Sequence, residues 1–165
     1  VRERVALFDQ SSFAKFRIIG TDAEKALNRI CANNVAKPSG ALTYTQMLNS
    51  KGGIECDLTV ARLAKDEFYL VSGTGFRTHD SAWIRSQFLA DEKVELHDIT
   101  EEWATFSLMG PLAREVLAQV TENDLENENF PFGTFSYTNL TLTTKRISQL
   151  TLISLAHETI DHPNT

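Results

Sequence analysis

Two acidic residues beside a pair of glycines are the side chains of this sequence best suited to chemistry. They lie in the segment 52–60, which reads Gly-Gly-Ile-Glu-Cys-Asp-Leu-Thr-Val. If this segment is a strand, alternation places Glu55 and Asp57 on one face and Cys56 on the other. Two carboxylates on one face can act as a coupled acid/base pair near neutral pH. The plainer alternative is that Asp57 is an exposed residue next to a turn.

Other residues that often do chemistry lack the spacing that it requires. His79 and Asp80 are neighbours in an expected helix, where adjacent side chains point apart, so no dyad is expected between them. The remaining histidines have no visible partners, and neither a zinc nor an iron site is expected. Gly73, Thr74 and Gly75 form too short a motif to bind a dinucleotide and are typical of a turn from strand to helix.

Composition excludes several classes of function. The 165 residues fit one domain, and the 22 acidic and 16 basic side chains give a formal net charge of −6. Because no basic run offsets this charge, nucleic acid is a poor partner. No apolar run is long enough for a membrane span, and no signal peptide is apparent. Cys31 and Cys56 lack metal-ligand spacing and are expected to be free thiols.

A strand and an amphipathic helix are the first elements expected to surround these residues. Residues 13–19 alternate apolar and basic side chains, which predicts a strand with Lys15 and Arg17 on a solvated face. Residues 21–24 have the Thr-x-x-Glu pattern of a capping box. The helix that they begin should end near residues 33–34. Its expected buried stripe consists of Ala23, Ala26, Leu27 and Ile30.

The central elements are expected to be strands joined by short turns. Residues 41–48 and 54–63 form a hairpin around the turn residues 49–53. Residues 68–72 extend this hairpin into an antiparallel meander. Further strands are expected at 94–99, at 104–109 and within 135–147.

Two more helices separate these groups of strands. The first is expected over residues 76–89, with Trp83, Ile84 and Phe88 turned inward. The second follows Gly110 and Pro111. Its expected apolar stripe consists of Leu112, Val116, Leu117 and Val120. A polar, solvated connection follows over 121–129. This order predicts an α+β fold, an antiparallel sheet built from hairpins with helices packed on it.

Five segments in order resemble the aminomethyltransferase family, the T-protein of the glycine cleavage system. They are the opening strand at 7–13, the helix entry at 20–23, residues 33–35, the Gly-Gly-Ile strand at 52–58 and the Gly-Pro segment at 108–113. The resemblance covers about residues 4–135. Residues 73–80 and 83–85 are more similar to the C-terminal folate-binding domain of dimethylglycine and sarcosine dehydrogenases. In this sequence, Ser11, Ser12 and Phe13 stand where stand-alone T-proteins typically have Ser-His-Met.

The resemblance implies a fold like the N-terminal domain of T-protein, incomplete here, and folate-dependent chemistry. In the family a one-carbon unit passes from an N-methylated glycine-derived adduct to tetrahydrofolate. The key carboxylate of the family falls on Asp57, which makes it the expected catalytic residue. Phe13 falls where an apolar residue lies against the pterin. Tyr44, Gly73 and Thr74 are expected to bind the cofactor because they lie in the same neighbourhood.

The resemblance also implies a longer parent protein. Its other half would be an FAD oxidoreductase domain, so FAD belongs to that partner alone, and it would lie in the mitochondrial matrix or a bacterial cytoplasm. Residues 1–148 are expected to form the folate-binding domain. Residues 149–165 are an atypical tail in which the family's Tyr-x-Gly-Glu motif is not found. The chain by itself is therefore expected to bind folate weakly or not at all and not to catalyse. The alternatives are a non-catalytic folate-binding module and a truncated inactive remnant.

Overall fold

The computed structural model describes residues 1–122, 124–130, 135–138 and 150–153. The strands are β1 (Ala6–Asp9), β2 (Ala14–Ile19), β3 (Leu42–Leu48), β4 (Ile54–Ala64), β5 (Glu67–Ser72), β6 (Glu95–Asp98), β7 (Ala104–Met109), β8 (Phe135–Thr138) and β9 (Leu150–Ile153). The helices are α1 (Ala23–Ile30), the short 3-10 helix η1 (Thr74–Phe76), α2 (Arg77–Gln87) and α3 (Ala113–Leu117).

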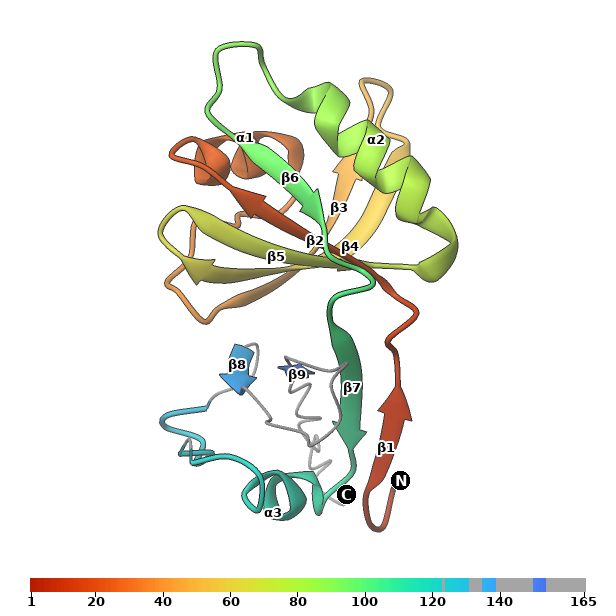
Figure 1. The fold of residues 1–165 in the computed structure, drawn as a ribbon, viewed down its shortest axis with the longest axis vertical. Helices are drawn as coiled ribbons and strands as arrows, with labels where there is room; N and C mark the ends of the chain where they lie inside the picture. The colour runs from red at the N-terminus through yellow and green to blue at the C-terminus, as the bar shows by residue number, and fades with distance from the viewer. Residues whose placement is uncertain (123, 131–134, 139–149, 154–165) are drawn as a thin grey trace, which may run out of the picture.

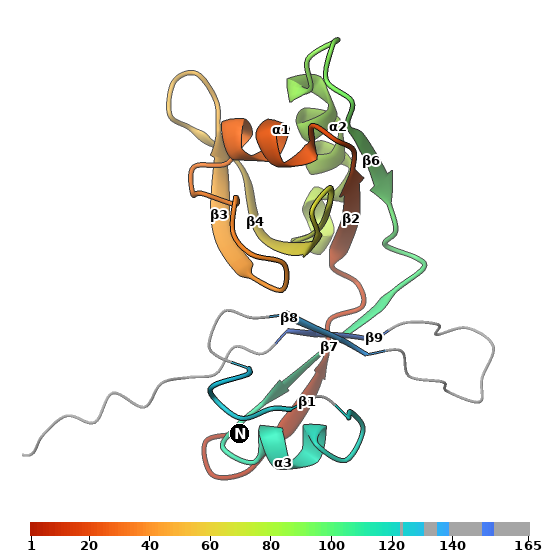
Figure 2. The ribbon, with the colours of Figure 1, turned by 90° about the vertical axis from the view of Figure 1, so that its left-hand side faces the viewer.

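Two sheets make up the described structure. The first is five-stranded and antiparallel, in the order β3-β4-β5-β2-β6, and the second has the order β1-β7-β9-β8. Figure 1 shows α1 and α2 on one side of the five-stranded sheet and the second sheet on its other side, and the view in Figure 2 agrees. The predicted α+β fold is thereby confirmed.

The meander at the centre of the five-stranded sheet agrees with the sequence prediction. β3 pairs with β4 from Leu42 opposite Ala61 to Leu48 opposite Ile54, and β4 in turn pairs with β5. β8 falls within the predicted strand region 135–147, of which 139–147 lie outside the described residues. β9 was not predicted, and it pairs in parallel with β7 and antiparallel with β8.

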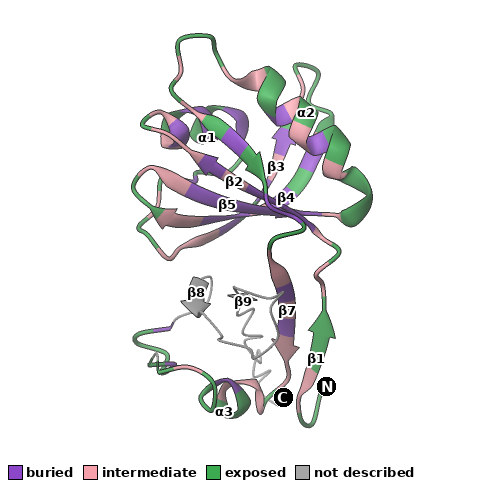
Figure 3. Cartoon of the chain, viewed as in Figure 1, coloured by how far each residue is buried: buried purple, intermediate pink, exposed green. Residues whose placement is uncertain are grey.

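The main core lies between the helices and the five-stranded sheet. The predicted stripe of α1 is buried in full, and residues of alternate positions on the strands complete the cluster. Figure 3 shows this buried layer between the sheet and the two helices. Ile84 of α2 is buried there, with Trp83 and Phe88 packed partly against it, as expected. No helix in the described part of the chain is long and apolar enough to cross a membrane.

The start and end of α1 differ from the prediction. The predicted capping box does not form, because Asp22 occupies the cap without a side-chain cap bond. Its carboxylate instead accepts a hydrogen bond from the backbone N–H of Lys93 at 2.9 Å. The helix ends at Ile30, before the predicted end, since Cys31 becomes extended and bridges to Met47 of β3. Tertiary pairing thus decides both ends of this helix.

Lys15 contradicts the prediction of a solvated face on β2. Its side chain is fully buried, whereas Arg17 is only partly covered. The reason is a second apolar cluster on this face, in which the segment between β6 and β7 folds over the sheet. Trp103 from that segment stacks on Tyr69 of β5, with ring centroids 5.4 Å apart. Alternation therefore correctly placed Lys15 and Arg17 on the same face of β2, but it did not predict that another segment covers Lys15.

α3 is shorter than its apolar pattern suggests. It has five residues, and of its predicted stripe only Leu117 is buried, whereas Val116 and Val120 are exposed. A helix of little more than one turn cannot present a stripe of that length. Leu125 and Phe130, which follow the helix, are buried with Leu117 in a small cluster. The connection predicted over residues 121–129 is therefore not uniformly solvated.

Candidate functional site

Asp57 is exposed on the face of the five-stranded sheet that the helices do not cover. It pairs with Gln46 across β3 and β4, and Gln46 Nε2 donates a hydrogen bond to Asp57 Oδ1 at 3.2 Å. Tyr44 lies two residues earlier on β3, and hydrogen bonding to the Asp57 carboxylate raises the pKa of its phenol. An ionised carboxylate has about four acceptor positions. Asp57 can therefore keep both neighbours and still accept hydrogen bonds from a ligand.

Three other residues predicted for the site come together beside Asp57. Ser72 at the end of β5 is paired with Ala14 on one side and Leu58 on the other. Phe13, Gly73 and Asp57 are the next residues outward along these three strands. Thr74 follows, and its Oγ1 donates a hydrogen bond to Ser12 Oγ at 3.2 Å. The structure thus gathers all five sequence-predicted residues at one end of one sheet face.

Glu55 has different neighbours from Asp57. Its Oε1 accepts a hydrogen bond from Asn49 Nδ2 at 2.8 Å, and its Oε2 lies 3.4 Å from His79 Nε2. Asp57 is bonded to Gln46 and Tyr44 instead. The two carboxylates have separate partners, so the coupled acid/base pair considered from the sequence is not supported. Asp57 is therefore a single carboxylate at this position, without Glu55 as a partner.

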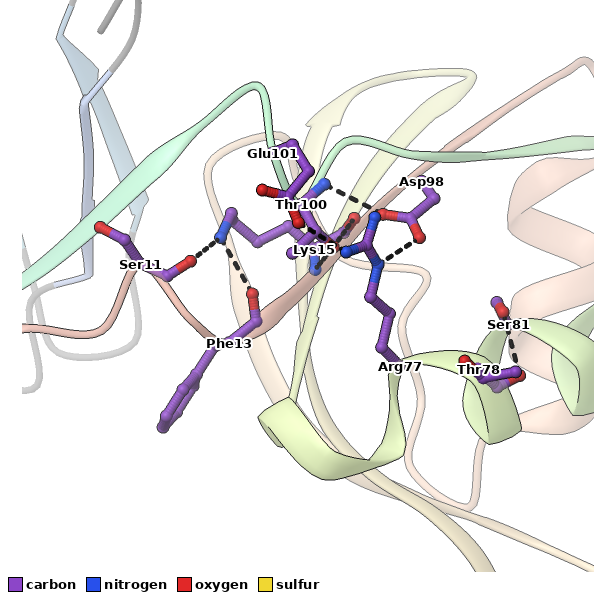
Figure 4. Close-up of polar contacts among 9 residues, drawn as sticks. All are labelled: Ser11, Phe13, Lys15, Arg77, Thr78, Ser81, Asp98, Thr100 and Glu101. Carbon is purple, nitrogen blue, oxygen red and sulfur yellow. Dashed lines mark hydrogen bonds and ion pairs between the residues drawn. The ribbon is translucent and has the colours of Figure 1, made fainter. Parts of the chain in front are cut away.

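Lys15 fixes the loop that carries Phe13. Its Nζ donates to the carbonyl oxygen of Ser11 at 2.7 Å and to that of Phe13 at 2.9 Å. Figure 4 shows the ammonium between these two carbonyls and the Phe13 ring directed away from it. Burial lowers the pKa of Lys15, against the opposing attraction of Glu101 and other acidic groups nearby. The buried charge is therefore placed to hold the loop rather than to meet a ligand.

A second charged group joins the start of α2 to the same region. Arg77 Nε lies 2.6 Å from Asp98 Oδ2, and its Nη1 lies 2.7 Å from Glu101 Oε1. Asp98 Oδ1 accepts from the backbone of Thr100, whose hydroxyl accepts from the backbone N–H of Lys15 at 3.0 Å. Figure 4 shows this chain of contacts from α2 to β2. It fixes the turn containing Gly73 and Thr74 relative to the Phe13 loop.

Gln46 and Lys15 were not predicted as site residues. Gln46 could have been found from the hairpin register, since the turn at residues 49–53 sets which residue of β3 lies opposite Asp57. Lys15 gave no such signal, because a lysine that alternates with apolar residues is more often exposed than buried.

His79 and Asp80 form a contact that the sequence argument excluded. His79 Nδ1 lies 3.0 Å from Asp80 Oδ1, where Asp80 is buried and His79 half exposed. Adjacent Cβ atoms do diverge on a helix, but the imidazole is long enough to reach back to the neighbouring carboxylate. Cys56 joins them, and one potential ligand atom from each of the three residues lies within 4.8 Å of the others. This group lies apart from the Asp57 partners described above.

Comparison with known proteins gives a consistent set of relatives. The model of the family described as the GCVT N-terminal domain matches residues 1–154. Human mitochondrial sarcosine dehydrogenase is 38% identical over 148 residues, which cover 81% of this chain and 16% of that protein. Mouse mitochondrial dimethylglycine dehydrogenase is 35% identical over 152 residues, which cover 90% of this chain and 17% of that protein.

A solved structure agrees with these sequence relatives. Glycine cleavage system aminomethyltransferase T from Bartonella henselae superposes with a TM-score of 0.71 at 26% sequence identity. The superposition covers 81% of this chain and 36% of that one. The chain therefore spans about a sixth of the length of the two dehydrogenases and about a third of the aminomethyltransferase.

Proposed function

Because the chain belongs to the GCVT N-terminal domain family, we propose that it binds tetrahydrofolate on the sheet face that carries Asp57. The domain is of the aminomethyltransferase type and is related to dimethylglycine and sarcosine dehydrogenases. The proposal concerns the ligand and the role of the site. In the reaction tetrahydrofolate is the one-carbon acceptor, and its ring nitrogens need an acceptor for their N–H groups.

The position of Asp57 carries this proposal. Its carboxylate is exposed, has acceptor positions left, and is oriented by Gln46 at 3.2 Å. Phe13 lies one strand position beyond Ala14 on the same end of the sheet and is partly buried against the second apolar cluster. A pterin has a polar edge with N–H donors and a flat apolar face. A carboxylate next to an apolar aromatic residue is complementary to both.

The same carboxylate supports a role in the transfer step. As the one-carbon unit moves from an amine to a folate nitrogen, positive charge develops near the reacting carbon. A fixed carboxylate stabilises that charge and accepts hydrogen bonds from the folate N–H groups, whose protons end on the departing amine. Hydrogen bonding to Asp57 raises the pKa of the Tyr44 phenol, so Tyr44 is placed beside the carboxylate as a neutral hydrogen-bonding neighbour. Asp57 is the proposed catalytic residue, and Phe13, Tyr44, Gly73 and Thr74 are the proposed binding residues.

The remaining parts of the proposal concern the longer protein to which such a domain belongs. An N-methylated glycine is the source of the one-carbon unit, and an FAD-dependent oxidoreductase domain on the same chain generates the adduct. The two dehydrogenase relatives are described as mitochondrial, and the same location is proposed here for a eukaryotic parent. Residues 1–148 are proposed as the folate-binding domain and 149–165 as an atypical tail, whose residues 150–153 pair with β7 as β9.

Calorimetric titration of the chain with tetrahydrofolate tests the binding proposal. The expected result is saturable, weak binding that is reduced in Asp57→Ala. Oxidised folic acid is the ligand control. Its pterin ring lacks the N–H groups of the reduced ring, from which Asp57 is proposed to accept hydrogen bonds. The proposal is wrong if the folded wild-type chain and Asp57→Ala give the same titration curve, whether both bind or neither does.

A further inference from the structure

A second group of reactive side chains lies on the side of the five-stranded sheet where α2 packs. Cys56 and Asp80 are both 1% exposed, and His79 is half exposed at the edge of the group. One potential ligand atom from each residue lies within 4.8 Å of the other two. Cys56 alternates with Asp57 on β4, so this group and the proposed folate site face opposite sides of the strand.

The backbone explains why these three side chains meet. β4 pairs with β5 only from Leu58 onward, so its first residues have a strand neighbour on the β3 side alone. The first turn of α2 packs beside this free edge and places His79 and Asp80 there. An Asp80 carboxylate oxygen lies 3.0 Å from His79 Nδ1, and the potential ligand atoms of Asp80 and Cys56 lie within 4.8 Å of each other. A buried carboxylate is thus flanked by two groups that a metal ion can deprotonate.

We propose that Cys56, His79 and Asp80 bind a zinc ion. A thiolate, an imidazole and a carboxylate together are a set of ligands that suits zinc, whereas magnesium and calcium prefer oxygen ligands alone. One thiolate and one carboxylate supply two negative charges, which balance the charge of Zn²⁺. Glu55 Oε2 lies 3.4 Å from His79 Nε2, so it can accept a hydrogen bond from this nitrogen and orient the ring while Nδ1, on the Asp80 side, binds the ion.

Binding is an exchange of protons for the metal. Zn²⁺ forms one bond to Cys56 Sγ, one to an imidazole nitrogen of His79 and one to an Asp80 oxygen. The thiol proton leaves to solvent, together with the second imidazole proton where His79 is protonated. No electron is transferred. The bound ion joins the start of β4 to α2, and therefore holds the strand that carries Asp57.

Cobalt is the probe that reports the thiolate ligand directly. The chain, freed of metal with a chelator, is titrated with Co²⁺, and the expected result is a sulfur-to-cobalt charge-transfer absorption that Zn²⁺ then abolishes. Cys56→Ser is expected to lose this absorption, whereas Cys31→Ser is expected to keep it, because Cys31 is also buried but is not part of the group. Circular dichroism of each variant shows whether it is folded.

Zinc affinity, measured against a competing chelator, gives a second readout. His79→Gln is expected to weaken zinc binding by more than the roughly 10–100-fold that loss of an outer-shell partner costs. His97→Gln is the matched control, since His97 is about equally exposed and lies 3.2 Å from a glutamate oxygen. The proposal is overturned if the folded wild-type chain shows no thiolate absorption, or if both members of either pair behave alike. Neither result depends on folate, so the two proposals fail separately.

Discussion

Gln46 and Asp57 face each other across the β3–β4 hairpin, with 3.2 Å between Gln46 Nε2 and Asp57 Oδ1. The hairpin therefore presents the carboxylate with one oxygen already oriented by an amide. Directly opposed side chains of an antiparallel pair are sensitive to each other's charge. Substitutions of Gln46 can therefore test whether it lies opposite Asp57, without altering Asp57 itself.

Gln46→Glu is expected to destabilise the fold. It places two carboxylates directly opposite each other, which costs about 0.2–1 kcal/mol of unfolding free energy. Gln46→Leu, which removes the amide without adding a charge, is the matched comparison. Urea denaturation at low and high salt measures both variants. The loss of unfolding free energy should be larger for Gln46→Glu than for Gln46→Leu, and it should decrease at high salt, because salt screens exposed charges. A loss that does not change with salt would argue against the pairing of Gln46 with Asp57.

Tyr44 is expected to titrate above the ordinary range of a tyrosine. Hydrogen bonding to Asp57, followed by partial desolvation and the charge of Asp57, raises the pKa of its phenol. Since the folded pKa exceeds the unfolded value of about 10, the associated stability is present below pH about 10 and is lost as pH rises through the folded value. Absorbance of tyrosinate measures this titration, and Tyr44→Phe identifies its share among the three tyrosines.

Asp57→Asn should return the pKa of Tyr44 toward its ordinary value, because the carboxylate that accepts a hydrogen bond from the phenol is gone. The change is isosteric, so the strand pairing should be kept. If the titration of Tyr44 is the same in Asp57→Asn as in the wild type, the two side chains do not interact in solution.

Lys15→Met should destabilise the protein even though it removes a buried charge. The partly buried carbonyls of Ser11 and Phe13 lose their donor, and an acceptor left unsatisfied costs at most about 1–3 kcal/mol. Lys25→Met on the exposed side of α1 makes the same chemical change and should stay within about 0.5 kcal/mol. Chemical denaturation compares the two, and equal effects would show that Lys15 is not a tether.

Gly20→Ala should be among the most damaging single changes. Gly20 has φ +145, and a Cβ added there would lie 2.0 Å from the carbonyl oxygen of Lys93. The backbone conformation alone costs about 1–3 kcal/mol for a residue with a side chain, and the clash adds to it. Gly75→Ala meets no atom within 4 Å and should change stability by less than about 0.5 kcal/mol. Thermal unfolding distinguishes them, and a well-tolerated Gly20→Ala would contradict this close approach.

The sequence predicted the strands of the meander and the buried stripe of α1 because both follow from local periodicity. β7 was predicted with its bounds as observed, Ala104–Met109, for the same reason. Local patterns failed where a distant segment intervened. Lys15 is buried because the segment with Trp103 covers its face, and the cap of α1 is replaced by a contact to Lys93.

The candidate site was predictable to a similar extent. Resemblance to a family predicted Asp57 and its neighbours as site residues, and the observed pairing of strands brings those residues together. The contact between His79 and Asp80 was wrongly excluded, because Cβ directions on a helix do not limit how far a rotated imidazole can reach. The group they form with Cys56 needs the packing of α2 against β4, which no spacing along the chain encodes.

The affinity of Asp57→Asn for tetrahydrofolate tests the central proposal most directly. The amide keeps the size of the side chain but loses the charge that accepts the folate N–H groups. Hydrogen bonds to charged groups contribute about 1.5–3 kcal/mol, so the dissociation constant should rise by about tenfold or more. Asp91→Asn, the same change at an exposed turn, should leave it within about twofold. An unchanged dissociation constant in Asp57→Asn would contradict the account.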